Sequence, residues 1–249
     1  MDFPGHGKSD SMGKDAWYPF LDYPEYVVEV ARSKGWGRFS LVGHSLGGAV
    51  AMFVAGTFPE LIERCVFIDA LGPIMATVGS SPKLLRRSIE SRRVLLPKEA
   101  KLYPSFDDAV RQRLKSVPKW GAGQTMSWKG AASLVAGGSQ ALDDDQVKFT
   151  NDVRLRAHST SYVTEDTVMN FLKAVKCPCL MVRGERGMVT ENATFRARKA
   201  ALGELLGDLV LPGSHHLHLD ADTAPLVAES VAVFLRGGKH ANLHMQSTL

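Results

Sequence analysis

The sequence is poor in cysteine, and its few cysteines are not spaced as a disulfide framework. Cys65, Cys177 and Cys179 are the only three among 249 residues, and each lies inside an apolar stretch. Small secreted domains that depend on disulfides carry cysteines at a much higher density. The C-x-C spacing of Cys177 and Cys179 also differs from the C-x-x-C of redox motifs. We therefore expect an intracellular compartment, the cytoplasm first, and no redox or metal role for these thiols.

Long apolar runs and a strong charge of one sign are also missing. No apolar run reaches the roughly 18 residues that a membrane-spanning helix needs. The 30 basic residues face 26 acidic ones, and a formal charge of +4 is too weak to indicate a nucleic-acid partner. The terminal Ser247-Thr248-Leu249 resembles the peroxisomal signal Ser-Lys-Leu only loosely, because Thr248 replaces the basic residue. A peroxisomal location is therefore the weaker alternative.

Short apolar runs alternate with helical patterns, which is typical of parallel strands joined by crossover helices. The strands are expected at residues 39–43, 65–69, 179–183 and 209–211. Their near-continuous hydrophobicity indicates burial on both faces of the sheet. A helix that ends near Pro59 is expected to follow the first strand. These patterns predict the α/β class, with a mainly parallel sheet flanked by helices.

Between the second and third expected strands the pattern changes. Residues 73–176 show several amphipathic helical stretches and no strand, so we expect a helical cap over the upper edge of the sheet. The core would then comprise residues 1–72 and 177–236. Residues 237–249 are polar and begin with glycine, and we expect them to form a disordered tail. The acidic run at 143–145 lacks the spacing of a calcium loop and is interpreted as a loop or a helix start.

A basic amphipathic helix is predicted at residues 84–96. Leu84, Leu85, Ile89 and Leu96 fall roughly on one face, with four arginines elsewhere. The simplest interpretation is a solvated basic face. A patch for an acidic ligand or a membrane surface is the open alternative.

The motif Gly43-His44-Ser45-Leu46-Gly47 is the strongest chemical signal, because G-x-S-x-G falls directly between an expected strand and an expected helix. A serine on so sharp a turn takes up strained backbone angles, and we expect the glycines on both sides to be sterically required. Ser45 is then a candidate nucleophile, and the N–H of Leu46 a candidate oxyanion donor. The alternative is a glycine-rich turn in which Ser45 only caps a helix.

An activated serine needs a base, and three histidines follow the last expected strand. His215, His216 and His218 could suggest a zinc site, but they lack a convincing fourth ligand. A general base that follows the serine in sequence is the better interpretation.

Three segments resemble the α/β-hydrolase superfamily: DFPGHGKS at the start, GHSLGG, and PGSHHLHLD. Residues 149–187 are more specifically similar to the serine hydrolase-like (Kraken-like) family, and the resemblance extends over residues 1–236. It implies an α/β-hydrolase fold with a cap, Ser45 as the nucleophile and Leu46 as half of the oxyanion hole. It also implies His215 as the base, because this residue matches the family's G-x-H. No metal or organic cofactor is implied.

The acid of the triad is where the sequence departs from the common pattern. Many superfamily members place an aspartate where this chain has Met188. Some relatives place the acid at the end of the preceding strand, where this chain has Asp69. We favour Asp69, then Glu191, and Glu185 remains open.

In this superfamily the D-x-P-G-H-G-x-S loop follows a strand, and here the loop stands at residue 1. We therefore expect a truncated product of an active hydrolase, with residues 39–43 as a bare sheet edge and with one oxyanion amide missing. Gly7-Lys8-Ser9 could also end a phosphate-binding P-loop, but that motif needs a glycine where Asp2 stands.

The favoured function is a serine hydrolase acting on a small ester, thioester or related acyl compound through an acyl-Ser45 intermediate. The truncation would impair this activity. The alternative is a catalytically silent protein that binds or signals through the pocket between sheet and cap. Trp120, Trp128 and Met126 are interpreted as either pocket lining or core. The sequence leaves the oligomeric state undecided.

Overall fold

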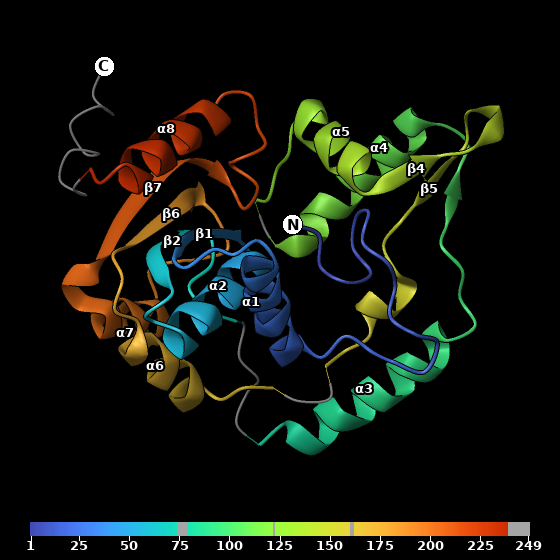
Figure 1. Ribbon diagram of the computed structural model, residues 1–249. Coiled ribbons are helices and arrows are strands. Elements are labelled where there is room, and N and C mark those ends of the chain that lie inside the picture. Colours follow the sequence, from blue (N-terminus) through green and yellow to red (C-terminus); the bar gives the residue numbers. More distant parts are fainter. Residues whose placement is uncertain (74–78, 122, 160–161, 239–249) are drawn as a thin grey trace.

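The computed structural model describes residues 1–73, 79–121, 123–159 and 162–238, and the expected tail lies almost wholly outside this part. A four-stranded parallel sheet forms the centre of the body (Figure 1). Its strands, in spatial order, are β1 (Phe39–His44), β2 (Ile62–Ile68), β6 (Cys179–Arg186) and β7 (Leu206–Ser214). Each contains most or all of one expected strand. The predicted α/β class and parallel sheet are therefore confirmed.

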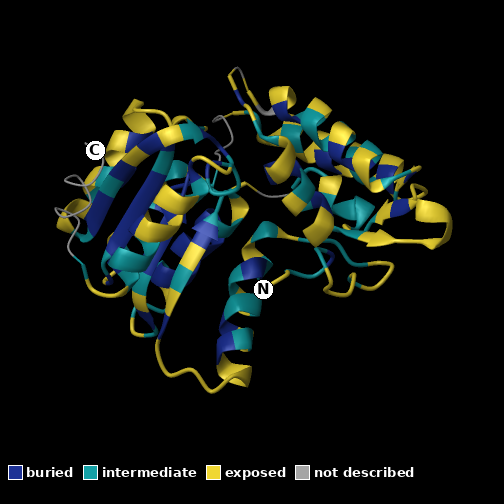
Figure 2. Ribbon diagram, turned by 90° about the horizontal axis from the view of Figure 1, so that it is seen from above, coloured by how far each residue is buried: buried dark blue, intermediate teal, exposed yellow. Residues whose placement is uncertain are grey.

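Helices cover both faces of this sheet. They are α1 (Tyr23–Ser33), α2 (Leu46–Thr57), α6 (Glu165–Ala174) and α7 (Ala193–Leu202) on one face, and α8 (Ala224–Leu235) on the other. Cys65 and Phe67 of β2 pack in the first layer, whereas Val66 and Ile68 pack in the second. Because successive strand residues point to opposite faces, a strand covered on both sides must be apolar throughout. Figure 2 shows these buried strands between their helices.

The two edge strands are less buried than the central pair. Val42 of β1 is 51% exposed and Val210 of β7 is 43% exposed. Among the described residues, the core cluster beneath α8 contains side chains of β2, β6 and β7 but none of β1. The near-continuous burial predicted for all four strands therefore holds only for β2 and β6.

The prediction that residues 73–176 contain no strand is wrong. Within the described residues, the segment expected to form the cap holds a three-stranded antiparallel sheet in the order β3-β5-β4. Its elements are β3 (Leu102–Tyr103), α4 (Phe106–Ser116), α5 (Trp128–Gly137), β4 (Ser139–Ala141) and β5 (Val147–Phe149). Strands of two or three residues are too short to show an alternating pattern, and they depend on packing against α4 and α5. The acidic run at 143–145 forms the turn that joins β4 to β5.

Two helices in this stretch lie apart from that small sheet. Helix α6 packs on α2, where Val168 and Leu172 are fully buried in the core of the body. Helix α3 (Ser81–Leu95) lies along the opposite side of the cap (Figure 1). The Oγ atom of Ser88 donates to the carbonyl of His158 over 2.6 Å and holds α3 in place. None of the helices in the described part has the length and apolar character of a bilayer-spanning segment.

The opening loop closes on itself instead of forming a phosphate cradle. The backbone N–H of Lys8 donates to the Asp2 carboxylate over 2.9 Å, and Ser9 Oγ donates to the Asp2 carbonyl over 2.8 Å. The first helical turn begins only at Phe20, so no helix follows Ser9 as a P-loop requires. Arg154, paired with Asp152, then ties this segment to the chain by donating to backbone carbonyls of residues 12–16.

Candidate active site

Ser45 occupies the sharp turn between β1 and α2. Its backbone has φ 53° and ψ −115°, a conformation that non-glycine residues rarely adopt. The turn is held because the Ser45 N–H donates to the Ile68 carbonyl over 3.1 Å, and its carbonyl accepts from the Ala49 N–H. The side chain is thereby presented at the carboxyl edge of the sheet.

The glycines around Ser45 do not all have the same steric role. A Cβ at Gly43 would overlap the backbone of Gly47, and one at Gly48 would lie 3.0 Å from the Cβ of Ala70. A Cβ at Gly47 would meet nothing within 4 Å. The expected steric requirement therefore holds for Gly43 but is wrong for Gly47. Gly43 must be a glycine because the Gly47 backbone lies against it. Gly48 is the second tight position.

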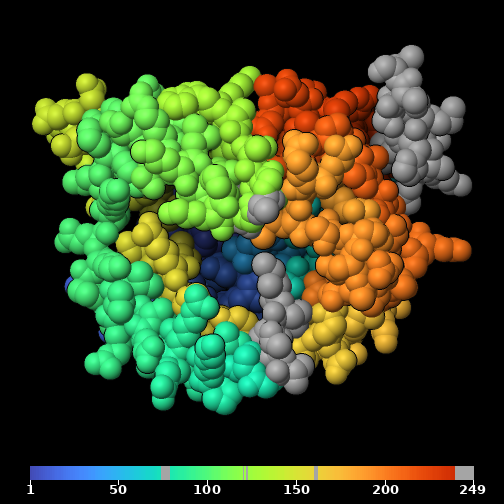
Figure 3. Space-filling model, turned by 180° about the vertical axis from the view of Figure 1, so that it is seen from behind, coloured from blue at the N-terminus to red at the C-terminus, as the bar shows by residue number. Residues whose placement is uncertain are grey.

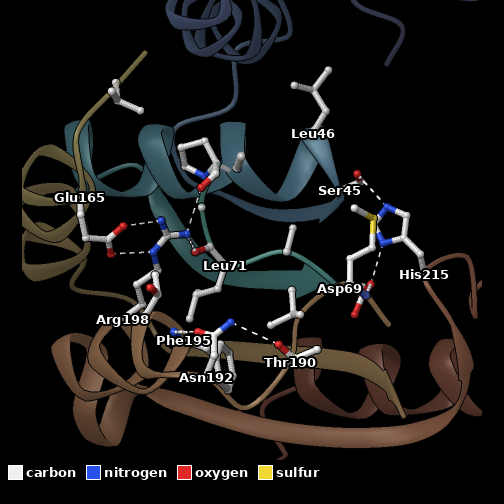
Figure 4. Close-up of a pocket in the computed structure, with 18 of the residues that line it drawn as sticks. Ser45, Leu46, Asp69, Leu71, Glu165, Thr190, Asn192, Phe195, Arg198 and His215 are labelled. Carbon is white, nitrogen blue, oxygen red and sulfur yellow. Dashed lines mark hydrogen bonds and ion pairs between the residues drawn. The ribbon is translucent and has the colours of Figure 1, made fainter. Parts of the chain in front are cut away.

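The structure brings Ser45, His215 and Asp69 into one hydrogen-bonded chain (Figure 4). His215 Nε2 lies 2.9 Å from Ser45 Oγ, and His215 Nδ1 lies 2.6 Å from Asp69 Oδ2. Asp69 and His215 are only 2% and 6% exposed. A buried carboxylate requires a donor, so the proton rests on Nδ1 and Nε2 accepts from the serine hydroxyl. This is the tautomer that a general base needs.

The loop after β6 forms the seat of Asp69. The N–H of Met188 donates to Asp69 Oδ2 over 2.7 Å, and a Cβ at Gly187 would collide with the same carboxylate. Many superfamily members carry the acid at the position of Met188. In this chain, that position instead supplies a backbone N–H donor to Asp69, which follows β2. Glu191 instead pairs with Arg183 over 2.8 Å. Glu185 is exposed, so neither glutamate takes the place of Asp69.

His44 joins the three histidines after β7 in a cluster, and sequence reasoning missed its part in it. His44 Nε2 donates to the backbone carbonyl of His215 over 2.8 Å, and its ring centroid lies 4.1 to 4.8 Å from those of His215, His216 and His218. Burial, reinforced by the neighbouring imidazoles, lowers the pKa of His44 to about 2. The same causes lower the pKa of His216 to about 3 and that of His218 to about 4. These rings are therefore neutral at physiological pH and can pack together.

The same cluster is the group of described residues that could hold a metal. Ligand atoms of His44, His215 and His216 lie within 4.8 Å of one another, a different set from the three sequence neighbours considered above. Both ring nitrogens of His215 already make hydrogen bonds, to Asp69 and to Ser45, so a metal ion there would have to break one of them. We therefore include no metal in the proposed chemistry.

The cap holds the loop that carries the base. The Gln124 side chain accepts from the His215 N–H over 3.0 Å and donates to the Arg186 carbonyl over 2.7 Å. Ser214 Oγ donates to the Thr125 carbonyl over 2.6 Å. Gln124 lies 91 residues before His215 in the chain, and no sequence pattern links the two; only the fold brings Gln124 to His215.

A cavity of about 730 Å³ opens beside Ser45 and His215. Its wall is mainly apolar, with Phe20, Leu46, Leu71, Val163, Met188 and Phe195 among the lining residues. Figure 3 shows the hollow on the face of the molecule opposite to that in Figure 1. Neither Met126 nor Trp128 is among the described lining residues, and the side chain of Trp120 lies outside the description.

Arg198 and Glu165 in the cavity wall neutralise each other's charge as an ion pair. Arg198 pairs with Glu165 over 2.7 Å and also donates to the backbone carbonyls of Leu71 and Pro73 (Figure 4). Arg198 is the single Lys or Arg among the described lining residues, so that part of the wall offers no unpaired cation. The pair fixes the chain that leads from Asp69 into the cap.

Comparison with known proteins places the chain in a family. Residues 1–229 match the family described as "Alpha/beta hydrolase family". A serine hydrolase-like protein of Dictyostelium discoideum is 29% identical over 235 residues, which cover 90% of this chain and 63% of that protein. One from Danio rerio is 26% identical, covering 95% of this chain and 72% of that protein. The chain belongs to the alpha/beta hydrolase family, and its resemblance to serine hydrolase-like proteins is confirmed.

A solved structure shows the same fold. The crystal structure of a hypothetical protein from Pseudomonas aeruginosa PAO1 matches with a TM-score of 0.84 at 34% identity. The match covers 94% of this chain and 80% of that one. The chain thus spans less than two thirds of the Dictyostelium relative, but most of this structural neighbour.

A matched pair of glycine substitutions tests the geometry of the turn. Gly43→Ala should abolish reactivity of Ser45 and lower the melting temperature, because the new methyl group overlaps the Gly47 backbone. Gly47→Ala should keep the fold and gain up to about 1 kcal/mol of helix stability. Thermal unfolding and fluorophosphonate labelling would measure both. Equal tolerance of the two substitutions would contradict the steric account.

The histidine cluster predicts acid-sensitive stability. The folded-state pKa values of His44, His216 and His218 lie below their ordinary 6.5. As the pH falls below 6.5, these histidines therefore become protonated in the unfolded chain while they stay neutral in the folded chain. Stability should be fully present above about pH 6.5 and fall toward pH 4, by up to about 1.4 kcal/mol per pH unit for each histidine. Denaturant unfolding at a series of pH values would measure this slope. It should be shallower in His216→Gln/His218→Gln, and an unchanged slope would contradict the prediction.

Proposed function

We propose that the chain is a serine hydrolase that cleaves a small ester, thioester or related acyl compound through an acyl-serine intermediate. The observation that carries this proposal is the continuous chain from Ser45 Oγ through His215 to Asp69, with heavy-atom distances of 2.9 and 2.6 Å. Family membership alone leaves the chemistry open, because one fold hosts many functions. The arrangement of donor and acceptor atoms supports nucleophilic catalysis.

In the proposed reaction, Ser45 Oγ attacks the acyl carbon while its proton passes to His215 Nε2. The leaving group then departs and takes that proton, leaving an acyl-serine. A water molecule, deprotonated by the same nitrogen, hydrolyses the acyl-serine and restores the hydroxyl. Asp69 holds the imidazole and stabilises its protonated form.

The developing oxyanion needs donors in place before the reaction. Leu46 is the first residue of α2, so its N–H has no acceptor within the helix. The positive end of the helix dipole lies at the same point. We assign the Leu46 N–H as one oxyanion donor, whose loss in comparable sites costs about 10²–10³ in rate.

The cavity wall supports an uncharged acyl group as the substrate. Burying a carboxylate there would require a counter-charge, and Arg198 is already committed to Glu165 and two carbonyls. Apolar side chains line most of the remaining wall. We therefore propose apolar acyl chains over dicarboxylic acyl groups.

Labelling with a fluorophosphonate probe tests the assigned roles. Ser45→Ala should abolish labelling, because the attacked hydroxyl is gone. His215→Gln and Asp69→Asn should slow it by about 10²–10⁴ through loss of the base or of its tautomer. Glu191→Gln is the matched acid control and should stay close to wild type. Absence of labelling in the unmodified chain would instead favour the silent binding protein.

A series of nitrophenyl esters tests the assigned substrate class. The ratio kcat/KM should rise from acetate toward octanoate by up to about fourfold per methylene as the chain fills the cavity. A succinate half-ester should react at least about tenfold more slowly than its methyl-capped form, because the cavity leaves its carboxylate unpaired. A preference for the free carboxylate would contradict the assignment.

A further inference from the structure

Helix α3 presents an apolar stripe that the fold leaves uncovered. Leu85, Ile89 and Leu96 are 46%, 51% and 59% exposed. At 100° per residue the three side chains fall within about 40° of one another. The inward side of the helix instead uses Ser88 and Leu95, which are buried. None of the three belongs to a hydrophobic core cluster of the described residues.

The same helix concentrates the positive charge of the chain. It carries Lys83 and four arginines against the single acid Glu90, a formal charge of +4 that equals the net charge of the whole sequence. Arg86 and Arg93 fall beside the apolar stripe on the helical projection, and both are exposed. Arg92 is the exception, because its guanidinium lies 4.6 Å from the ring centre of Trp17.

We propose that α3 docks this protein on an anionic lipid bilayer. In this arrangement Leu85, Ile89 and Leu96 enter the boundary between headgroups and acyl chains, and the flanking arginines bind lipid phosphates. A helix with a narrow apolar side and a cationic surround has the composition of interfacial helices. Long arginine side chains can keep their charge at the headgroups while the apolar stripe inserts.

The shape of the surface favours a bilayer over an acidic protein. The exposed side of α3 is a single convex helix, and the apolar stripe runs along it between residues 85 and 96. A plane of anionic headgroups can contact the exposed side of α3 along its whole length. The negative charge of the headgroups complements the positive charge of the arginines on α3. Pro73 in the wall of the cavity precedes α3 by only a short segment. If the proposed acyl specificity holds, docking would place the cavity close to lipophilic substrate, but binding itself does not depend on that specificity.

Vesicle sedimentation of the whole chain tests the docking. The probes are vesicles of phosphatidylcholine alone and vesicles containing about 30% phosphatidylserine, at about 0.1 M salt. We expect binding to the anionic vesicles and its loss at about 1 M salt or without phosphatidylserine. Equal binding to both vesicle types, or none to the anionic ones, would overturn the proposal.

Matched variants assign the binding to α3. Arg86→Gln/Arg93→Gln should weaken it on the order of 25-fold, at about fivefold per basic residue. Lys115→Gln/Lys129→Gln removes the same charge from exposed positions elsewhere and should weaken it much less. Leu85→Ser/Ile89→Ser should also reduce it, whereas Val94→Ser, on the opposite side of α3, should not.

Two further readouts separate the competing explanations. All variants should keep cooperative unfolding and fluorophosphonate labelling, so failure of docking is distinguishable from failure of the proposed catalysis. Equal vesicle binding by the α3 variants and their controls would overturn the assignment. Retention of the chain on immobilised polyglutamate, without vesicle binding, would show an acidic protein partner in place of the bilayer.

Discussion

The candidate site depends on the parallel alignment of β1, β2 and β7. The carboxyl ends of parallel strands meet at one edge of a sheet, and the residues just beyond those ends are Ser45, Asp69 and His215. Ser45 and Asp69 come from neighbouring strands. His215 comes from a strand two places beyond Asp69 and must reach across the end of β6. The contacts of His44 and Gln124 hold the His215 backbone at this position.

Three groups of contacts hold Asp69 and His215 in place. The loop after β6 holds Asp69 through Gly187 and Met188, and His44 anchors the backbone of His215 from the strand that leads to Ser45. Gln124 holds the same backbone from the cap. Gln124 therefore helps to set the position of the His215 imidazole.

Strand positions and the sharp turn at Ser45 could be predicted from the sequence because each depends on nearby residues. A strand buried on both faces must be apolar throughout, as β2 and β6 are, and a sharp turn into a helix needs small neighbours such as Gly43. The small sheet of the cap was missed because its strands are too short to carry a pattern. The role of α6 in the body was missed because an amphipathic helix does not specify the surface that it covers.

The sequence by itself determined the fold class, the place of Ser45 and a short set of histidines and acids, since these follow from local periodicity, turn sterics and motif spacing. Only the tertiary structure decided that Asp69, and not Glu191, lies against His215. It also decided that His44 and Gln124 hold the base and that the apolar stripe of α3 faces outward. The physical reason is that hydrogen bonding and burial depend on distances between residues that are far apart in the chain, and those distances exist only after the strands have aligned and the cap has packed.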